Sequence, residues 1–298
     1  LEKSSLLRRG RFLAASRGCL RCHLPDEPFN KKTAMPEVLA MGPSLIGVGS
    51  RLNRAWMEKW ILDPQSMRHA ARMPKMVHSP TESSHLAAFL GSLKNENIEK
   101  KVVLGDSKSG GVLFADLGCI SCHSLSENNT ISEDGRISLV GVGQKYLPGS
   151  LVAFLLEPDK HYPWIRMPNF RLSKEEAANL AVFLQELDSP VLTITASKGD
   201  AAKGKILASS RGCVACHELP CENKLISTSL QQLSALTGAG CLGEGSKGPR
   251  FPLSKEERSA IAIFLQERDG SLERHSPPEF ANRQFEELRC VACHERDG

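Results

Sequence analysis

The sequence predicts an all-α chain of small helical domains in tandem, and three observations lead to this fold class. A five-residue string occurs four times along the 298 residues, beginning at positions 19, 119, 213 and 290. Apolar residues at helical spacing surround its first three copies. The intervals between copies are short for domains with ordinary hydrophobic cores, so a bound group is expected to complete each core.

The repeated string reads Cys-x-x-Cys-His. Its cysteines are Cys19 and Cys22, Cys119 and Cys122, Cys213 and Cys216, and Cys290 and Cys293, followed directly by His23, His123, His217 and His294. This spacing is the attachment signature of haem c, in which both thiols bond to the porphyrin and the imidazole binds the iron. Zinc ribbons and thioredoxin-like dithiols also use Cys-x-x-Cys, but neither needs the histidine. The sequence therefore predicts four covalently attached haem c groups.

The composition gives little sign of a nucleic-acid partner. The formal charge is +4, and four haems would bring it to about 0 or −4 because each carries two propionates. Haem attachment implies export, so we expect a periplasmic or cell-surface location, although no signal peptide or transmembrane run is visible. Both ends resemble those of a processed or fragmentary chain.

Two of the ten cysteines, Cys221 and Cys241, lie outside the repeated strings. A disulfide between them is the expected state in an oxidising compartment. The alternative is that one of them binds iron as a thiolate.

Each repeat is expected to pair a first helix with a terminal helix. Gly10, Gly110 and Gly204 stand nine residues before the first cysteine of their strings, where a glycine indicates a close helix crossing. The expected partners are the helices around Phe89, Phe183 and Phe264 of the same repeats. Ser173 with Glu176 and Ser254 with Glu257 form capping boxes that begin the second and third of these helices.

This order of helix, haem string, glycine-rich loop, methionine loop and terminal helix resembles the class I cytochrome c fold. The resemblance covers residues 5–93 and 105–187 well, 198–268 in part, and only the opening of the fourth repeat. It implies cytochrome c domains at 1–95, 100–190 and 196–270, with the start of a fourth unit at 279–298. Repeats one and two are also similar to cytochrome c domains of large bacterial redox proteins.

The resemblance also implies a backbone carbonyl that orients the proximal histidine. In class I cytochromes a Gly-Pro-x-Leu element supplies it. Pro43 matches this pattern in repeat one, and Ile137 takes its place in repeat two.

Distal ligands are expected from two methionines. Met73 and Met167 each stand 16 residues before the phenylalanine of the terminal helix, within segments that align without gaps. We expect Met73 opposite His23 and Met167 opposite His123. Met76 is the rival to Met73, and packing in the core is the alternative role for all of them.

Repeat three has Gly248 where a methionine is expected, and no methionine follows Met167. The haem on His217 is therefore expected to be open or water-bound, with Lys247 as an alternative ligand. The fourth haem would need a ligand from elsewhere, including a partner chain. The histidines that could supply it, each more ordinarily solvated or bonded to a propionate, are His69, His78, His85, His161 and His275.

The expected function is electron transfer between redox partners by an exported multihaem cytochrome, as part of a larger oxidoreductase. The alternative is a peroxidase-like enzyme or a reductase of a small ligand that uses the methionine-free haem. A structural or docking subunit is the third class. The sequence shows no further catalytic signature, so no catalytic residue is predicted and electron transfer is favoured over a self-contained enzyme.

Overall fold

A computed structural model describes residues 2–24, 42–68, 71–95, 104–126, 136–162, 165–187, 197–233, 240–243 and 248–272, with scattered positions from 277 to 290. These ranges are mostly helical, which confirms the all-α class. The named strands are β1 (His123–Ser124) and β2 (Ile137–Ser138), which pair in parallel. No helix in the described ranges is both long and apolar enough to cross a bilayer.

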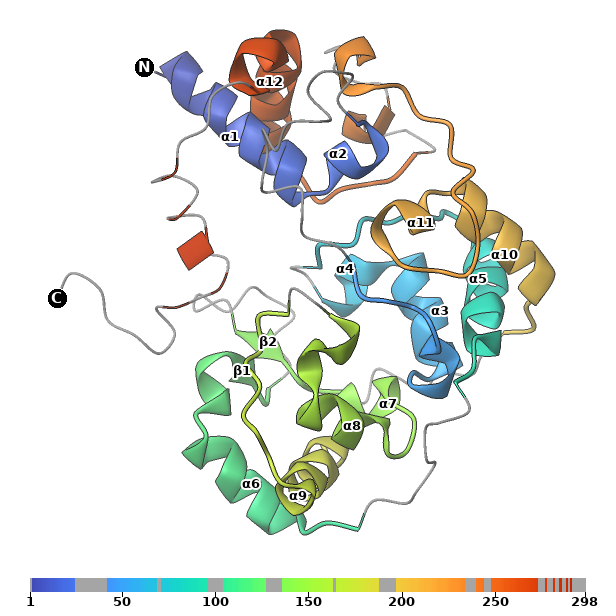
Figure 1. Ribbon diagram of the computed structural model, residues 1–298, viewed down its shortest axis with the longest axis vertical. Helices are drawn as coiled ribbons and strands as arrows, with labels where there is room; N and C mark the ends of the chain where they lie inside the picture. The colour runs from blue at the N-terminus through green and yellow to red at the C-terminus, as the bar shows by residue number, and fades with distance from the viewer. Residues whose placement is uncertain are drawn as a thin grey trace, which may run out of the picture.

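Three long helix pairs organise these ranges (Figure 1). Helix α6 (Ser107–Asp116) crosses α9 (Lys174–Gln185), as predicted for repeat two. Helix α1 (Glu2–Ser16) crosses α12 (Lys255–Leu272), and α10 (Ala201–Ser210) crosses α5 (Pro80–Ser92). The last two pairs each join repeat one to repeat three.

Glycines permit all three crossings, as the sequence predicts. A Cβ added to Gly10 would lie 2.0 Å from the carbonyl oxygen of Ala260. A Cβ on Gly110 would lie 2.1 Å from the oxygen of Asn179, and one on Gly204 would lie 2.0 Å from that of His85. Only glycine allows the backbones to approach so closely. The predicted crossings are thus confirmed, while the predicted partners are confirmed only for repeat two.

Residues 1–95 and 196–270 therefore do not each pack as one unit, so these two predicted domains are wrong. Repeats one and three have exchanged their first helices and haem strings, because every repeat offers the same glycine and the same terminal-helix backbone. We name the resulting units by the histidines of their strings. The second repeat alone makes the His123 unit, which lies at the bottom of Figure 1.

The His123 unit contains α6, α9, β1 and β2. Between them lie η4 (Cys119–Ser121), α7 (Val142–Lys145), α8 (Ser150–Leu156) and η5 (Pro158–His161). Ser173 and Glu176 form the predicted capping box at the start of α9. Phe114, Leu151, Leu155 and Leu180 belong to its core.

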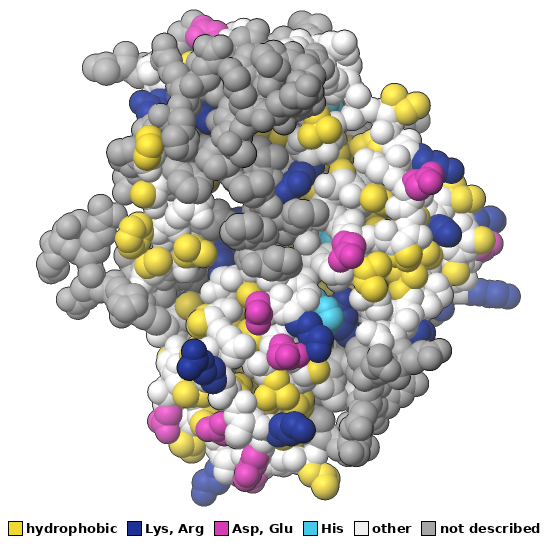
Figure 2. Space-filling model, viewed as in Figure 1, with side chains coloured by type: hydrophobic (Ala, Val, Ile, Leu, Met, Phe, Trp, Pro, Cys, Tyr) yellow, Lys and Arg dark blue, Asp and Glu magenta, His cyan; other side chains and the backbone are white. Residues whose placement is uncertain are grey.

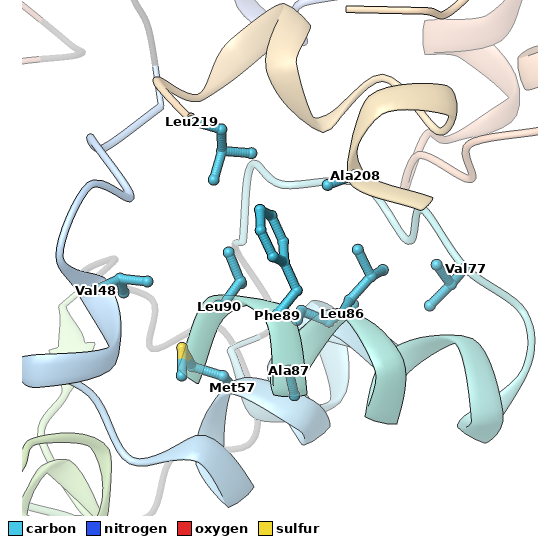
Figure 3. Close-up of a cluster of buried hydrophobic side chains, with 10 residues drawn as sticks. Val48, Met57, Val77, Leu86, Ala87, Phe89, Leu90, Ala208 and Leu219 are labelled. Atoms are coloured by element: carbon cyan, nitrogen blue, oxygen red, sulfur yellow. The ribbon is translucent and has the colours of Figure 1, made fainter. Parts of the chain in front are cut away.

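The His217 unit joins the second half of repeat one to the first half of repeat three. It contains α5 and α10 with η3 (Val48–Ser50), α3 (Arg54–Leu62), α4 (Pro64–Met67) and α11 (Cys213–Cys216). Figure 3 shows its core, in which Leu219 and Ala208 of repeat three face Phe89 of α5. Ala208 is 1% exposed and Phe89 is 5% exposed, so the exchanged parts share one buried core.

The His23 unit joins the opposite halves. It contains α1 and α12 with α2 (Cys19–Cys22), η6 (Leu230–Gln232) and η7 (Gly240–Leu242). Leu20 of repeat one and Phe264 of repeat three are both fully buried in its core. The second predicted capping box is present before α12, where Glu257 N–H donates to Ser254 Oγ at 3.2 Å. On the face shown in Figure 2, acidic and basic side chains are interspersed.

Candidate haem attachment sites

Each described Cys-x-x-Cys-His string is a single tight turn that follows a left-handed glycine. Gly18, Gly118 and Gly212 have φ values of 74°, 69° and 84°, where an L side chain is strained. The backbone N–H of His23 and that of His217 then donate to the carbonyls of Cys19 and Cys213, each at 2.9 Å. The turn therefore places the histidine next to the second cysteine at a fixed geometry.

A backbone carbonyl orients the imidazole in all three units. The Nδ1 atom of His217 lies 2.9 Å from the oxygen of Pro43, and that of His123 lies 3.3 Å from the oxygen of Ile137. Nδ1 of His23 lies 2.8 Å from the oxygen of Thr228. Nδ1–H donates a hydrogen bond to the carbonyl and keeps its proton, which makes Nε2 the nitrogen that could bind a metal. Pro43 and Ile137 thus have the predicted role, but Pro43 serves His217 rather than His23.

Thr228 is a functional residue that the sequence prediction missed. The segment around it lacks the Gly-Pro pair, but Thr228 is followed by Ser-Leu, as Pro43 and Ile137 are. Leu230 N–H donates to the carbonyl of Leu24 at 3.0 Å, and Leu45 N–H donates to that of Glu218 at 3.1 Å. The shared Ser-Leu pair is the signal that could have identified Thr228.

The thiols of the strings are chemically suited to attachment rather than to dithiol exchange. Burial raises the pKa of Cys19 and of Cys213 to about 12, and burial raises that of Cys22 to about 11. Redox-active dithiols and zinc ligands need the opposite shift toward the thiolate. Among the described residues, no cluster of three or more His, Cys, Asp or Glu side chains is placed to hold a metal ion. For His217, burial lowers the pKa, which favours the neutral imidazole that iron requires.

The predicted disulfide between Cys221 and Cys241 is wrong, because both cysteines are free. The exchange of halves explains this result. Cys221 packs against the core of the His217 unit, whereas Cys241 is close enough to Cys19 to raise the pKa of that thiol.

Met73 lies in the His217 unit. The sequence paired it with His23, and its position does not agree with that pairing. The indole Nε1–H of Trp60 donates to Met73 Sδ at 3.2 Å, and the Gln65 side chain donates to the Met73 carbonyl at 2.7 Å. Both partners come from the α3–α4 segment of the same unit. The position of Met73 makes it the candidate distal ligand opposite His217.

Met167 packs against the core of the His123 unit, where the sequence placed it. Met76, the rival to Met73, lies beside the turn of an attachment string, where its Cε would be 3.7 Å from a Cβ on Gly212. Met76 is thus next to the cysteine side of the site, which leaves Met73 as the preferred ligand.

Gly248 belongs to the His23 unit, which is the methionine-free one. The loops of Met73 and Gly248 pair antiparallel, with Lys75 N–H and Arg250 N–H each donating to the other's carbonyl at 2.9 Å. His78 Nε2 lies 3.0 Å from the Gly248 oxygen, and its Nδ1 is buried without a protein partner in the described part of the chain. The prediction of a methionine-free haem on His217 therefore moves to His23.

The other candidate ligands have different positions. His85 Nδ1 accepts from the backbone N–H of Asp200 at 2.9 Å, which anchors the start of α10. His161 lies between two units, and its carbonyl accepts from Ser44 N–H at 2.9 Å. Cys290 is a half-buried free thiol. His69, Lys247, His275, Cys293 and His294 lie outside the described residues.

A cluster of cations lies between the His217 and His123 units. Lys145 Nζ is 5.1 Å from the ring centroid of Trp56, and burial together with Arg68 and Arg51 lowers its pKa to about 7. Burial lowers the pKa of Arg51 and of Arg68, and no described Asp or Glu is among the groups that oppose this shift. The Nε of Arg51 is buried without an acceptor in the described structure. Haem propionates would supply the acidic oxygens that this cluster lacks, so these residues fit the group.

No family model, curated protein or solved structure matches this chain.

Proposed function

We propose that the chain is an exported, multihaem c-type cytochrome that relays electrons between redox partners as part of a larger oxidoreductase. One observation carries the proposal. In each of the three described strings, both cysteines are free and the histidine Nδ1 is turned to a backbone carbonyl. In this arrangement the two thiols could hold a haem, and Nε2 is the nitrogen that could bind its iron. Bound haem would supply a one-electron couple between ferric and ferrous iron.

Cysteine, histidine and methionine side chains would have different roles in holding the haems. Cys19 and Cys22, Cys119 and Cys122, and Cys213 and Cys216 would hold the haems covalently, and Cys290 and Cys293 would hold a fourth next to His294. His23, His123 and His217 would bind iron on the proximal side. Met73 and Met167 would bind it on the distal side, where a thioether favours the ferrous state and excludes substrates. Two closed sites of this kind suit electron transfer better than substrate chemistry.

The proposal is tested by expressing the chain in a host that attaches haem outside the cytoplasm. Mass spectrometry is expected to give the mass of the polypeptide plus four haems, and a redox titration is expected to be reversible at every one of them. A holoprotein without covalent haem, or with haems that no electron-transfer partner or mediator can reduce, contradicts the proposal.

A second candidate function rests on Gly248. Because the His23 unit has no methionine at this position, its iron would have room for a small ligand such as peroxide or nitric oxide. Carbon monoxide added to the reduced protein is expected to bind this haem and to spare those of Met73 and Met167. Failure to bind would remove the support for an enzyme and would make His78 the first distal ligand to test, by a His78→Ala variant.

A further inference from the structure

We infer that the haem string of His217 is the hub of the relay, so that electrons pass between the His23 and His123 sites through it. The order of the strings in space is then His23, His217, His123, which differs from their order along the chain. This inference depends on the proposed electron-transfer function. It is carried by two junctions, both of which involve the His217 unit.

The first junction brings two attachment strings into contact. A Cβ on Gly18 would lie 4.0 Å from Cys216 Sγ, and a Cβ on Gly212 would lie 3.7 Å from Cys22 Sγ. The contact is reciprocal, since the second cysteine of each string faces the left-handed glycine of the other. The attachment sulfurs of the two haems are therefore neighbours.

The second junction joins the His217 unit to the His123 unit. Leu52 and Tyr146, which are equivalent residues of repeats one and two, form an antiparallel bridge. Asn53 N–H donates to the carbonyl of Lys145 at 2.8 Å, and Leu147 N–H donates to that of Arg51 at 2.9 Å. The cation cluster of Arg51, Lys145 and Arg68 lies at this junction. Its positive charge could bind the propionates of a haem from either unit. The propionate edges of both haems would then lie at this junction.

Among the described residues, the His123 string has no counterpart of the first junction. Within this part of the chain, a Cβ on Gly118 would have only Ser121 Oγ of the same string within 4 Å, at 3.9 Å. Figure 1 shows the same order, with α3, α5, α10 and α11 between the α1–α12 pair and the α6–α9 pair. The His217 unit thus contacts each of the other two units in the described part of the chain.

The test is electron paramagnetic resonance of the fully oxidised holoprotein, which detects magnetic coupling between neighbouring ferric haems. Removing the hub haem with Cys213→Ala and Cys216→Ala is expected to leave the His23 and His123 haems uncoupled from each other. Removing the His123 haem with Cys119→Ala and Cys122→Ala is expected to leave the coupling between the His23 and His217 haems intact. Coupling between the His23 and His123 haems that survives loss of the hub haem would overturn the inference.

Two glycine variants test the inference without removing a haem, because loss of a haem could unfold the protein. Gly18→Leu and Gly118→Leu impose a similar backbone strain, because both glycines have left-handed φ values. Only the leucine at position 18 would extend toward Cys216, so only Gly18→Leu is expected to change haem–haem coupling. Equal effects of the two variants would contradict the inference. A wild-type protein without reducible covalent haem would instead contradict the proposed function itself.

Discussion

The substitution Gly204→Ala gives a quantitative test of the exchanged helices. The added methyl group would lie 2.0 Å from the carbonyl oxygen of His85, about 1.4 Å inside ordinary contact, which begins at 3.4 Å. Its neighbour is backbone, so α10 and α5 must separate. Overpacking of this kind destabilises by about 1–3 kcal/mol. Alanine recovers up to about 1 kcal/mol through its helix propensity. An overlap with backbone places the loss at the upper end of its range, so we expect a net loss of about 2 kcal/mol.

The assay is urea unfolding of the ferric holoprotein, followed at the sulfur-to-iron charge-transfer band. Gly204 comes from repeat three, but it packs in the unit that contains Met73. We therefore expect the Met73 contribution to this band to be lost at lower urea, while that of Met167 is retained. The control is Gly111→Ala, whose methyl group would meet only the Phe183 side chain at 3.3 Å and is expected to preserve stability. Unchanged unfolding of the Met73 site in Gly204→Ala would refute the exchange.

Three further predictions concern other parts of the molecule. Lys145→Met is expected to lower the reduction potentials of the haems on His217 and His123, since positive charge favours the ferrous form. In the wild type the same potentials should fall as the pH rises through the Lys145 pKa of about 7. Redox titrations at several pH values would measure both effects. Trp60→Phe removes the hydrogen bond to Met73 and is expected to destabilise by at most about 1.5 kcal/mol while shifting the charge-transfer band of that haem alone. Alkylation of the unfolded, unreduced holoprotein is expected to label both Cys221 and Cys241, and protection of both would show the disulfide that the structure lacks.

The local parts of the fold were predictable because they depend on local chemistry. The glycine nine residues before each of the first three strings predicts a close crossing, since any Cβ at Gly10 or Gly204 would overlap a backbone carbonyl. The box of Ser173 and Glu176 predicts a helix start, because its two hydrogen bonds join residues three apart. Such features require no knowledge of the partner.

Which terminal helix each first helix crosses was not predictable, because the crossing involves backbone atoms that the repeats share. Gly10 and Gly204 contact backbone atoms of the terminal helices, and a backbone carbonyl is the same in every repeat. The crossing backbones do not distinguish the helix of Phe89 from that of Phe264, and the one side-chain difference at the crossing is His85, which accepts from Asp200 N–H, against Ala260. The choice instead depends on long-range contacts such as that of His23 with Thr228, whose carbonyl leaves no mark on residue type. The distal ligand assignments follow from the partner, so they changed with it.

The most direct test of the exchanged haem units is a nuclear magnetic resonance spectrum of the reduced holoprotein with ¹³C-labelled methionine methyl groups. A methionine bound to ferrous haem has its methyl resonance shifted far upfield by the porphyrin ring current. We expect two such resonances in the wild type, from Met73 and Met167. Removing the haem of Cys213 and Cys216 should abolish the Met73 resonance, whereas removing the haem of Cys19 and Cys22 should leave both in place. The reverse pattern, in which Met73 depends on the haem of Cys19 and Cys22, would contradict the exchange.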